Sequence, residues 1–330
     1  MKTTKMASKK KEFPNVNPPT QPTDPRTGEE RKKRFVTLIR AEKWWVERAR
    51  ENPIVFQEYL LDLPPARHHK IWTANLFSPD VNRLNIVAPR ESAKTQWLCV
   101  IFSWLIGKNS LLTNMLLSVS AKQAEARLNT IRNYIESDIR YRNVFPNVFI
   151  DYKRKTTQNE FSVWSNANNI SYNVWASIRQ RHNPNDPTFY AAGVGGKGVI
   201  GRRISGLYAG DDLIDEEDLT PGAQEKRENY ILTTVIPCLQ EEAKACNIGT
   251  RWMQDDVPER FSKNTSWKTL TISAIRKNPE TGEEESYWPE YWPIEKLYER
   301  KKEINNDVIW RLMYLSDSQG ATANLFTLES

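Results

Sequence analysis

Long hydrophobic runs are missing from this sequence of 330 residues. No apolar stretch approaches the ~20 residues that a membrane-spanning helix needs, and the basic N-terminus leads into proline and polar residues instead of a signal-peptide core. Cysteine is also scarce, because the chain has only Cys99, Cys238 and Cys246, an odd number of widely spaced thiols. We therefore expect neither a membrane protein nor a secreted one, and we expect reduced thiols in a cytoplasmic protein.

Charge is distributed unevenly along the chain. Residues 1–34 hold ten of the 47 Lys and Arg residues but only four of the 41 Asp and Glu residues, so residues 35–330 hold 37 of each sign. The N-terminal segment is also rich in proline and poor in large apolar residues, so it cannot bury enough surface to order itself. We expect residues 1–34 to form a disordered basic arm, which either solubilises the chain or attracts an acidic partner such as DNA.

Short apolar runs alternate with helix-like segments from residue 83 onward. The expected strands are 83–88, 115–120, 204–209 and 245–249, and the expected helices are 96–106, 121–136 and 220–239. This alternation predicts a mainly parallel sheet with helices on both faces. Three further β-like runs are expected at 161–164, 170–175 and 189–192, and two C-terminal helices at 294–304 and 307–315.

The segment after the first expected strand has the order of a phosphate-binding loop. It reads Pro89-Arg90-Glu91-Ser92-Ala93-Lys94-Thr95 and leads into a helix. Such a loop needs backbone N–H groups at a helix N-terminus, a lysine for the phosphates and a hydroxyl for Mg²⁺. In the pattern G-x-x-x-x-G-K-[ST] both glycines are alanine here, Ala88 and Ala93, whereas Lys94 and Thr95 are kept. A Lys-Thr pair at the start of an ordinary helix is the alternative.

A second half of the same site is expected at the end of strand 204–209. Asp211 and Asp212 follow this apolar run directly, where a carboxylate can hold Mg²⁺ beside a phosphate loop and the next one can position the attacking water. The acids that follow, at 215–218, are interpreted as a solvated helix start. The joint occurrence of both halves predicts a P-loop NTPase.

Five separated elements together resemble the ATPase region of the large terminase subunits of tailed bacteriophages, from about residue 55 to residue 320. They are, in order, Pro89 to Thr95, Leu117-Ser118-Val119-Ser120 with Gln123-Ala124, Gly201-Arg202-Arg203 before Gly210-Asp211-Asp212, Ile248-Gly249-Thr250-Arg251-Trp252 with Asp255-Asp256, and Tyr287-Trp288-Pro289-Glu290. The resemblance implies an α/β P-loop NTPase fold of the ASCE type over residues 35–260 and a small lid or linker subdomain over residues 261–330.

The resemblance also implies a function. That family uses ATP and Mg²⁺ to move double-stranded DNA into a procapsid, as a homo-oligomeric ring on the portal protein and with the small terminase subunit, in the host cytoplasm and away from membranes. Full-length members continue into a nuclease domain, which we expect to be absent here, so no nuclease activity is expected of this chain. Two alternatives stay open: another P-loop DNA translocase or helicase, and a non-catalytic DNA-binding assembly adaptor with a degenerate loop.

Site residues follow from the resemblance position by position. Lys94 and Thr95 match the Walker A pair, Asp211 matches the Mg²⁺ ligand that acts with Thr95, and Asp212 matches the catalytic carboxylate, where the family often has Glu. Thr250 matches the segment that senses the γ-phosphate. Residues upstream of the loop contact adenine in the family, and the candidates are Arg67, His68, His69 and Trp72, with a turn around a core tryptophan as the alternative.

A ring ATPase also needs a cation that neutralises transition-state charge. Arg202 and Arg203 are candidates for a finger that reaches a neighbouring subunit, and Arg90 is a candidate within its own subunit. Cations on the helix after Ser120 are candidate DNA contacts, although a solvated helix face is the favoured explanation for them; these are Lys122, Arg127 and Arg132.

Overall fold

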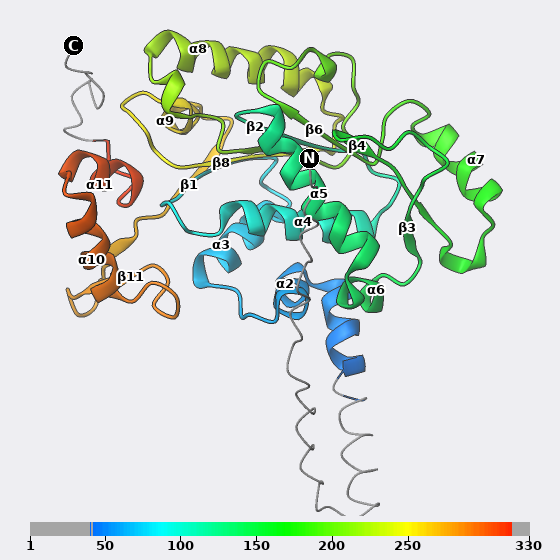
Figure 1. The fold of residues 1–330 in the computed structure, drawn as a ribbon, viewed down its shortest axis with the longest axis horizontal. Helices are drawn as coiled ribbons and strands as arrows, with labels where there is room; N and C mark the ends of the chain where they lie inside the picture. Colours follow the sequence, from blue (N-terminus) through cyan, green and yellow to red (C-terminus); the bar gives the residue numbers. More distant parts are fainter. Residues whose placement is uncertain (1–39, 41, 319–330) are drawn as a thin grey trace, which may run out of the picture. The chain divides into compact units, whose positions relative to one another are not determined.

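A seven-stranded sheet forms the centre of the computed structural model, which describes residues 40 and 42–318 (Figure 1). The strand order is β4-β6-β2-β7-β8-β1-β9, and every neighbouring pair is parallel except β4 and β6. The strands are β1 (Arg83–Val87), β2 (Asn114–Ser118), β4 (Glu160–Phe161), β6 (Phe189–Gly193), β7 (Leu207–Asp211), β8 (Lys244–Gly249) and β9 (Lys268–Thr271). The predicted α/β class with a mainly parallel sheet is confirmed.

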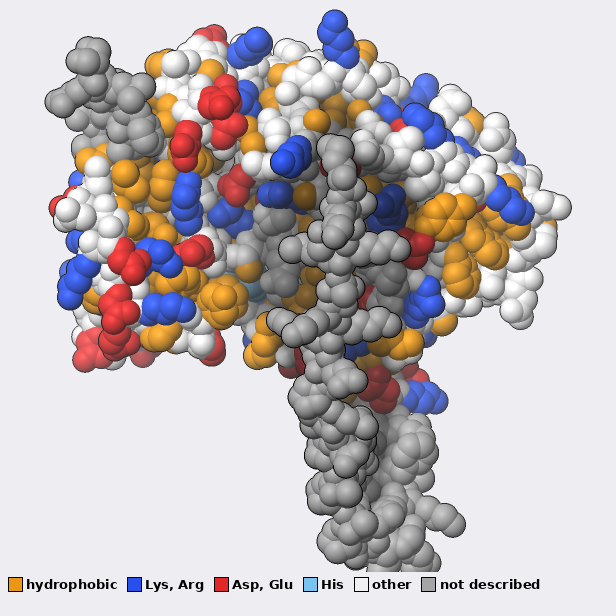
Figure 2. All heavy atoms as spheres, viewed as in Figure 1, with side chains coloured by type: hydrophobic (Ala, Val, Ile, Leu, Met, Phe, Trp, Pro, Cys, Tyr) orange, Lys and Arg blue, Asp and Glu red, His pale blue; other side chains and the backbone are white. Residues whose placement is uncertain are grey.

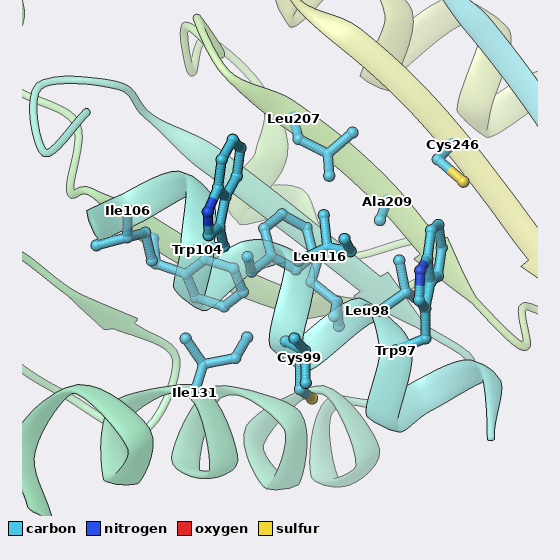
Figure 3. Packing of buried hydrophobic residues seen from close by; sticks show 14 of the residues in the cluster. Trp97, Leu98, Cys99, Trp104, Ile106, Leu116, Ile131, Leu207, Ala209 and Cys246 are labelled. Carbon is cyan, nitrogen blue, oxygen red and sulfur yellow. The ribbon is translucent and has the colours of Figure 1, made fainter. Parts of the chain in front are cut away.

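Helices cover both faces of this sheet because side chains along each strand alternate between two cores. Leu116, Leu207 and Ala209 pack into the core under α4 (Lys94–Lys108) and α5 (Ala121–Ser137) (Figure 3). Met115 and Tyr208 pack into the opposite core, which contains residues of the π-helical segment Ile231–Val235 that continues α8 (Pro221–Tyr230). The three cysteines are free and buried.

Local signals explain where several helices begin. Asn52 caps α2 (Pro53–Leu61), and the Ser120 hydroxyl accepts a hydrogen bond from Gln123 N–H at the start of α5. Thr220 caps α8, with proline at its first position. These polar caps satisfy backbone N–H groups that the helix itself leaves without partners. Before β1 the chain also forms α3 (Arg67–Leu76), and residues 42–51 are helical.

Residues 138–206 lie between α5 and β7 in the sequence and form most of one flank of the fold. They contain α6 (Ile139–Val144), the antiparallel pair β3 (Val148–Ile150) and β5 (Val163–Ser165), α7 (Tyr172–His182), β4 and β6. The β-like run predicted at 170–175 is wrong. Ser171 caps a helix there by accepting from Val174 N–H, so the segment begins α7 instead.

The chain after β8 closes the sheet and then returns toward the loop that follows β1. After α9 (Val257–Lys263), β9 pairs with β1, so the sheet extends one strand past the boundary expected at residue 260. A hairpin of β10 (Ile275–Lys277) and β11 (Glu284–Ser286), α10 (Ile294–Ile304) and α11 (Asp307–Met313) complete the described chain. Arg90 N–H donates to the Met313 carbonyl at 2.9 Å. The arm expected at residues 1–34 lies outside the described residues.

No helix within residues 42–318 combines the length and apolar character needed to cross a membrane.

Candidate nucleotide site

The site is built where three neighbouring parallel strands end. Val87 at the end of β1 pairs with Gly249 at the end of β8, and Asp211 at the end of β7 pairs with Ile248. The carboxyl ends of these strands therefore lie at one edge of the sheet, which is where parallel α/β sheets bind ligands. The loop after β1, the two aspartates after β7 and Thr250 after β8 meet at this edge.

The loop that follows β1 holds two non-glycine residues in the left-handed region. Glu91 has φ of 63° and Ala93 has φ of 56°, so the second alanine stands at a glycine position and adopts the glycine conformation. Such residues cost roughly 1–3 kcal/mol each and persist where surrounding contacts fix them. The Ser92 hydroxyl provides one such contact by donating to the Pro89 carbonyl at 2.8 Å.

Lys94 links the three parts of the site. Its Nζ donates to Thr250 Oγ1 at 2.8 Å and to the Pro89 carbonyl at 3.0 Å, and it lies 4.0 Å from Asp212 Oδ2. The other oxygen of Asp212, Oδ1, accepts from the Thr250 N–H at 3.1 Å. Asp212 itself has φ of 42°. The structure thus places the predicted Lys94, Asp212 and Thr250 within direct reach of one another.

Asp211 lies beneath this network and is fully buried. It accepts from Thr95 Oγ1 at 3.0 Å and forms an ion pair with Arg127, whose Nε lies 2.9 Å from Oδ2. Burial raises the pKa of Asp211 and the neighbouring Asp212 charge raises it further, whereas Arg127 and the Thr95 hydroxyl lower it. Arg127 was expected on a solvated or DNA-facing surface of α5; its side chain instead points into the site.

A cavity of ≈ 490 Å³ opens above these residues. Its lining residues are Arg90, Glu91, Lys94, Val119, Gln123, Asp212, Ile214, Asp215, Glu216, Glu217, Thr250 and Trp252. The guanidinium of Arg90 lies 4.6 Å from the centre of the Trp252 ring. The acids at 215–217 were interpreted as a solvated helix start; Asp215 does cap a short 3₁₀ turn, and all three also line this cavity.

The segment after Thr250 is fixed by a buried ion pair. Asp256 caps α9, accepts from Trp252 N–H at 2.8 Å and lies 2.9 Å from Arg251 Nε. Burial raises the pKa of Asp256, and Arg251 and the backbone N–H donors lower it. Asp256 is fully buried, so it acts as a structural carboxylate that holds this segment.

The residues present fit a nucleotide with its metal ion. A hydroxyl and a carboxylate at hydrogen-bond distance, Thr95 and Asp211, are oxygen ligands of the kind that Mg²⁺ prefers, directly or through water. The backbone N–H groups at the start of α4 and the Lys94 ammonium suit a phosphate chain. Asp212 lines the cavity and can position a water molecule against it.

Comparison with solved structures decides the fold. The ATPase domain of the large terminase of a Thermus phage superposes with a TM-score of 0.51 at 13% sequence identity, covering 78% of this chain and 95% of that chain, and a point mutant of that domain gives 0.53 with the same identity and coverage. The described chain has the fold of a phage large-terminase ATPase domain.

The HK97 bacteriophage large terminase gives a TM-score of 0.49 at 13% identity, over 81% of this chain and 55% of that one. No family model matches the chain, and no curated protein matches its sequence. The expected α/β fold with a mainly parallel sheet is confirmed, and in this chain β8 lies between β1 and β7.

Within this terminase fold, two of the predicted arginines lie away from the cavity. Arg202 is paired with Glu160 at 3.0 Å and with Asp186 at 3.6 Å, and Arg203 N–H donates to Asp186 at 3.1 Å. Both precede β7 and therefore lie at the amino end of the sheet, opposite the phosphate loop. Arg90 is the one member of the predicted trio that lines the cavity within the described chain.

Trp72, predicted to contact adenine, is fully buried and packs against Trp97 at 5.4 Å between ring centres, so it does not line the cavity. The functional contacts that sequence reasoning missed are Arg127 to Asp211 and the approach of His68 and His69 to the loop. Arg127 follows Gln123 by one helical turn, and Gln123 lies in the first turn of α5. That spacing is the signal which could have placed both side chains toward β7.

Proposed function

We propose that this chain is the ATPase motor of a viral DNA-packaging terminase, which couples ATP hydrolysis to translocation of double-stranded DNA into a procapsid. The observation that carries the proposal is the convergence of Lys94, Thr95, Asp211, Asp212 and Thr250 at one sheet edge beside a cavity. The terminase fold and the P-loop architecture support it.

Each side chain has a task in this proposal. Lys94 and the loop N–H groups bind the phosphates, and Thr95 with Asp211 holds Mg²⁺, which supplies charge neutralisation when bound. Asp212 orients the attacking water, with its carboxylate fixed by Thr250 N–H. Thr250 contacts both Lys94 and Asp212, so it is placed to report on the terminal phosphate to the segment held by Asp256.

The test compares two lysines of the same helix. Lys94→Ala should abolish binding of Mg–ATP in calorimetry and DNA-stimulated phosphate release, because it removes the central cation of the site. Lys108→Ala, at the other end of α4 and paired with Glu51, should leave both unchanged. Unchanged phosphate release in Lys94→Ala would contradict the site assignment. A wild-type chain that does not bind Mg–ATP would favour the non-catalytic adaptor.

The flank formed by residues 138–206 is proposed as the DNA-binding surface. It holds ten Lys and Arg residues against four Asp and Glu residues, a net charge of +6, in a chain whose residues 35–330 are neutral overall. Figure 2 shows hydrophobic and basic side chains gathered over β3 and α7. Its exposed cations, suited to phosphates, are Arg142, Lys153, Lys155, Arg181, Lys197 and Arg203.

Charge reversal tests this surface. Lys153→Glu with Arg181→Glu should weaken binding of duplex DNA about tenfold or more at low salt and reduce the salt dependence of the affinity, because two phosphate contacts are lost. Lys302→Glu is the control, because Lys302 is an exposed lysine on α10 outside this flank. Equal losses from the two reversals would mean that overall charge, and not this surface, attracts DNA.

Assembly as a ring on the portal, and with the small terminase subunit, is part of the same proposal. Arg90 is the candidate cation within its own subunit because it lines the cavity. Arg202 and Arg203 remain the candidates for a neighbouring subunit. Mixing Arg202→Ala chains with Lys94→Ala chains should restore turnover only if the arginine acts across an interface, so the absence of rescue in a formed ring would exclude that role.

A further inference from the structure

Two histidines of α3 contact the backbone of the phosphate loop. His68 Nε2 lies 3.1 Å and His69 Nε2 lies 3.0 Å from the Ser92 carbonyl oxygen. A carbonyl oxygen only accepts, so both rings must carry their proton on Nε2 and donate it to the same atom. His69 Nδ1 can then accept from Gln57 Nε2, which lies 3.2 Å away.

The atom that receives both hydrogen bonds lies between the two strained residues of the loop. Ser92 is flanked by Glu91 and Ala93, which have φ of 63° and 56°. No glycine occurs from Ala88 to Thr95, so the backbone cannot reach this conformation without the cost that glycine avoids. Conformations of this kind persist only where neighbouring groups determine them from several sides.

The two rings are themselves fixed by their surroundings. Both histidines and Ser92 are buried. The His68 ring lies 5.1 Å from Tyr287 and 5.4 Å from Trp288, and the His69 ring lies 5.3 Å from Trp72. Burial lowers the pKa of His68 to about 3 and that of His69 to about 4, so both rings are neutral near pH 7.

We propose that His68 and His69 are positioning residues that hold a glycine-free phosphate loop in the conformation that receives a triphosphate. The inference rests on the proposed ATP-binding function of the loop. It assigns the histidines a task other than contact with adenine: their N–H groups bind the loop backbone, and Trp72 packs behind them. They act through Ser92 and touch neither nucleotide nor metal.

The experiment asks whether glycine can replace the histidines. His68→Leu with His69→Leu removes both donors, and we expect amide exchange in residues 88–95 to quicken and the Mg–ATP dissociation constant to rise about tenfold, the value of two ordinary hydrogen bonds. His68→Gln with His69→Gln retains an N–H donor on each side chain and should stay near wild type. Adding Ala93→Gly to the leucine variant should restore much of the affinity, because glycine adopts positive φ without strain.

A matched control separates positioning from general stability. Asn169→Gly introduces glycine at another position of positive φ, 56°, outside the site. It should raise stability as Ala93→Gly does without restoring ATP affinity. Equal restoration by both glycines, or wild-type exchange and affinity in the leucine variant, would overturn the proposal.

Two further outcomes are also decisive. If the double leucine variant does not fold, each single leucine variant is compared with the single glutamine variant at the same position, and the same outcomes apply. If wild-type protein does not bind Mg–ATP, the proposed function is wrong. Amide hydrogen exchange in residues 88–95 then still shows whether the two histidines hold the loop backbone.

Discussion

The two ends of the parallel sheet carry the same kinds of side chain in different arrangements. At the carboxyl end, Lys94 and Asp212 border a cavity of ≈ 490 Å³ and lie 4.0 Å apart. At the amino end, Arg202 is closed between two carboxylates and over the Tyr190 ring, 3.6 Å from the ring centre. Asp212 has positive φ, as do two loop residues at its end of the sheet, whereas Arg202 does not.

The difference shows that charged residues beside a strand do not by themselves mark a site. At the amino end the charges neutralise one another, and neither Arg202 nor its partners Glu160 and Asp186 have positive φ. At the carboxyl end strained backbone and a cavity occur together, and such strain gathers at functional sites. The carboxyl end is therefore where we place the proposed nucleotide site.

Asp212→Asn is the sharpest test of this contrast. The amide keeps an oxygen for Thr250 N–H but loses the charge, so we expect turnover to fall by about 10²–10⁴ with folding and ATP affinity retained. Single-turnover phosphate release with a parallel binding titration measures both. Unchanged turnover would remove Asp212 from the reaction and leave the acids at 215–217 as candidates.

Arg127→Met should be the most destabilising of these changes. It leaves the buried Asp211 without its ion pair, which costs about 3 kcal/mol of unfolding free energy. Adding Asp211→Asn should recover most of that loss, and Arg132→Met on the same helix is the control. Denaturant titration reads all three, and a stable Arg127→Met protein would contradict the pairing.

Arg202→Ala tests the amino end. Loss of the contacts to Glu160, Asp186 and Tyr190 should lower unfolding free energy by about 2 kcal/mol, since the groups are partly buried, while the ATP dissociation constant of the monomer stays the same. Thermal melting with calorimetry separates the two effects. An unchanged melting temperature combined with lost turnover in the assembled ring would reverse our assignment of this end.

The smallest expected effect is a pH dependence of stability from His68 and His69. Their folded-state pKa values lie below that of a free histidine, 6.5, so the unfolded chain takes up protons that the folded chain does not. Stability is therefore fully present above pH 6.5 and declines as pH falls, by about 1 kcal/mol for each histidine at pH 6. Denaturant titrations at pH 7.5 and 6 should show this decline in wild type and a smaller one in the double glutamine variant.

Much of the fold could be predicted because its signals are local. The apolar runs of β1, β2, β7 and β8 and the amphipathic pattern of α5 are each contained in a short stretch of sequence. The order of the motifs along the chain indicated which strand ends would meet. The segment Ile170–Trp175 was predicted to be β-like because its apolar residues fit a short strand as well as a helix. The Ser171 cap makes it the start of a helix.

The missing parts of the site depend on tertiary placement. The spacing of Gln123 and Arg127 puts both side chains on one face of α5, but only the packing of α5 against the sheet brings that face to Asp211, 84 residues away from Arg127. The histidines likewise lie 24 and 23 residues from Ser92 and gain their partner only when α3 packs under the loop. Roles that rest on one contact between distant segments are therefore beyond pattern analysis.

The hydrogen bond from Arg90 N–H to the Met313 carbonyl has a mechanical consequence. It attaches the second residue of the phosphate loop to the last turn of α11, across 223 positions of sequence, while Glu91 beside it lies 3.5 Å from the Tyr314 hydroxyl. Any displacement of the loop backbone must therefore either move the end of α11 or break this hydrogen bond and the contacts of Glu91 with Tyr314 and Arg300. The last turn of α11 is thus joined directly to the loop backbone, with no intervening residue.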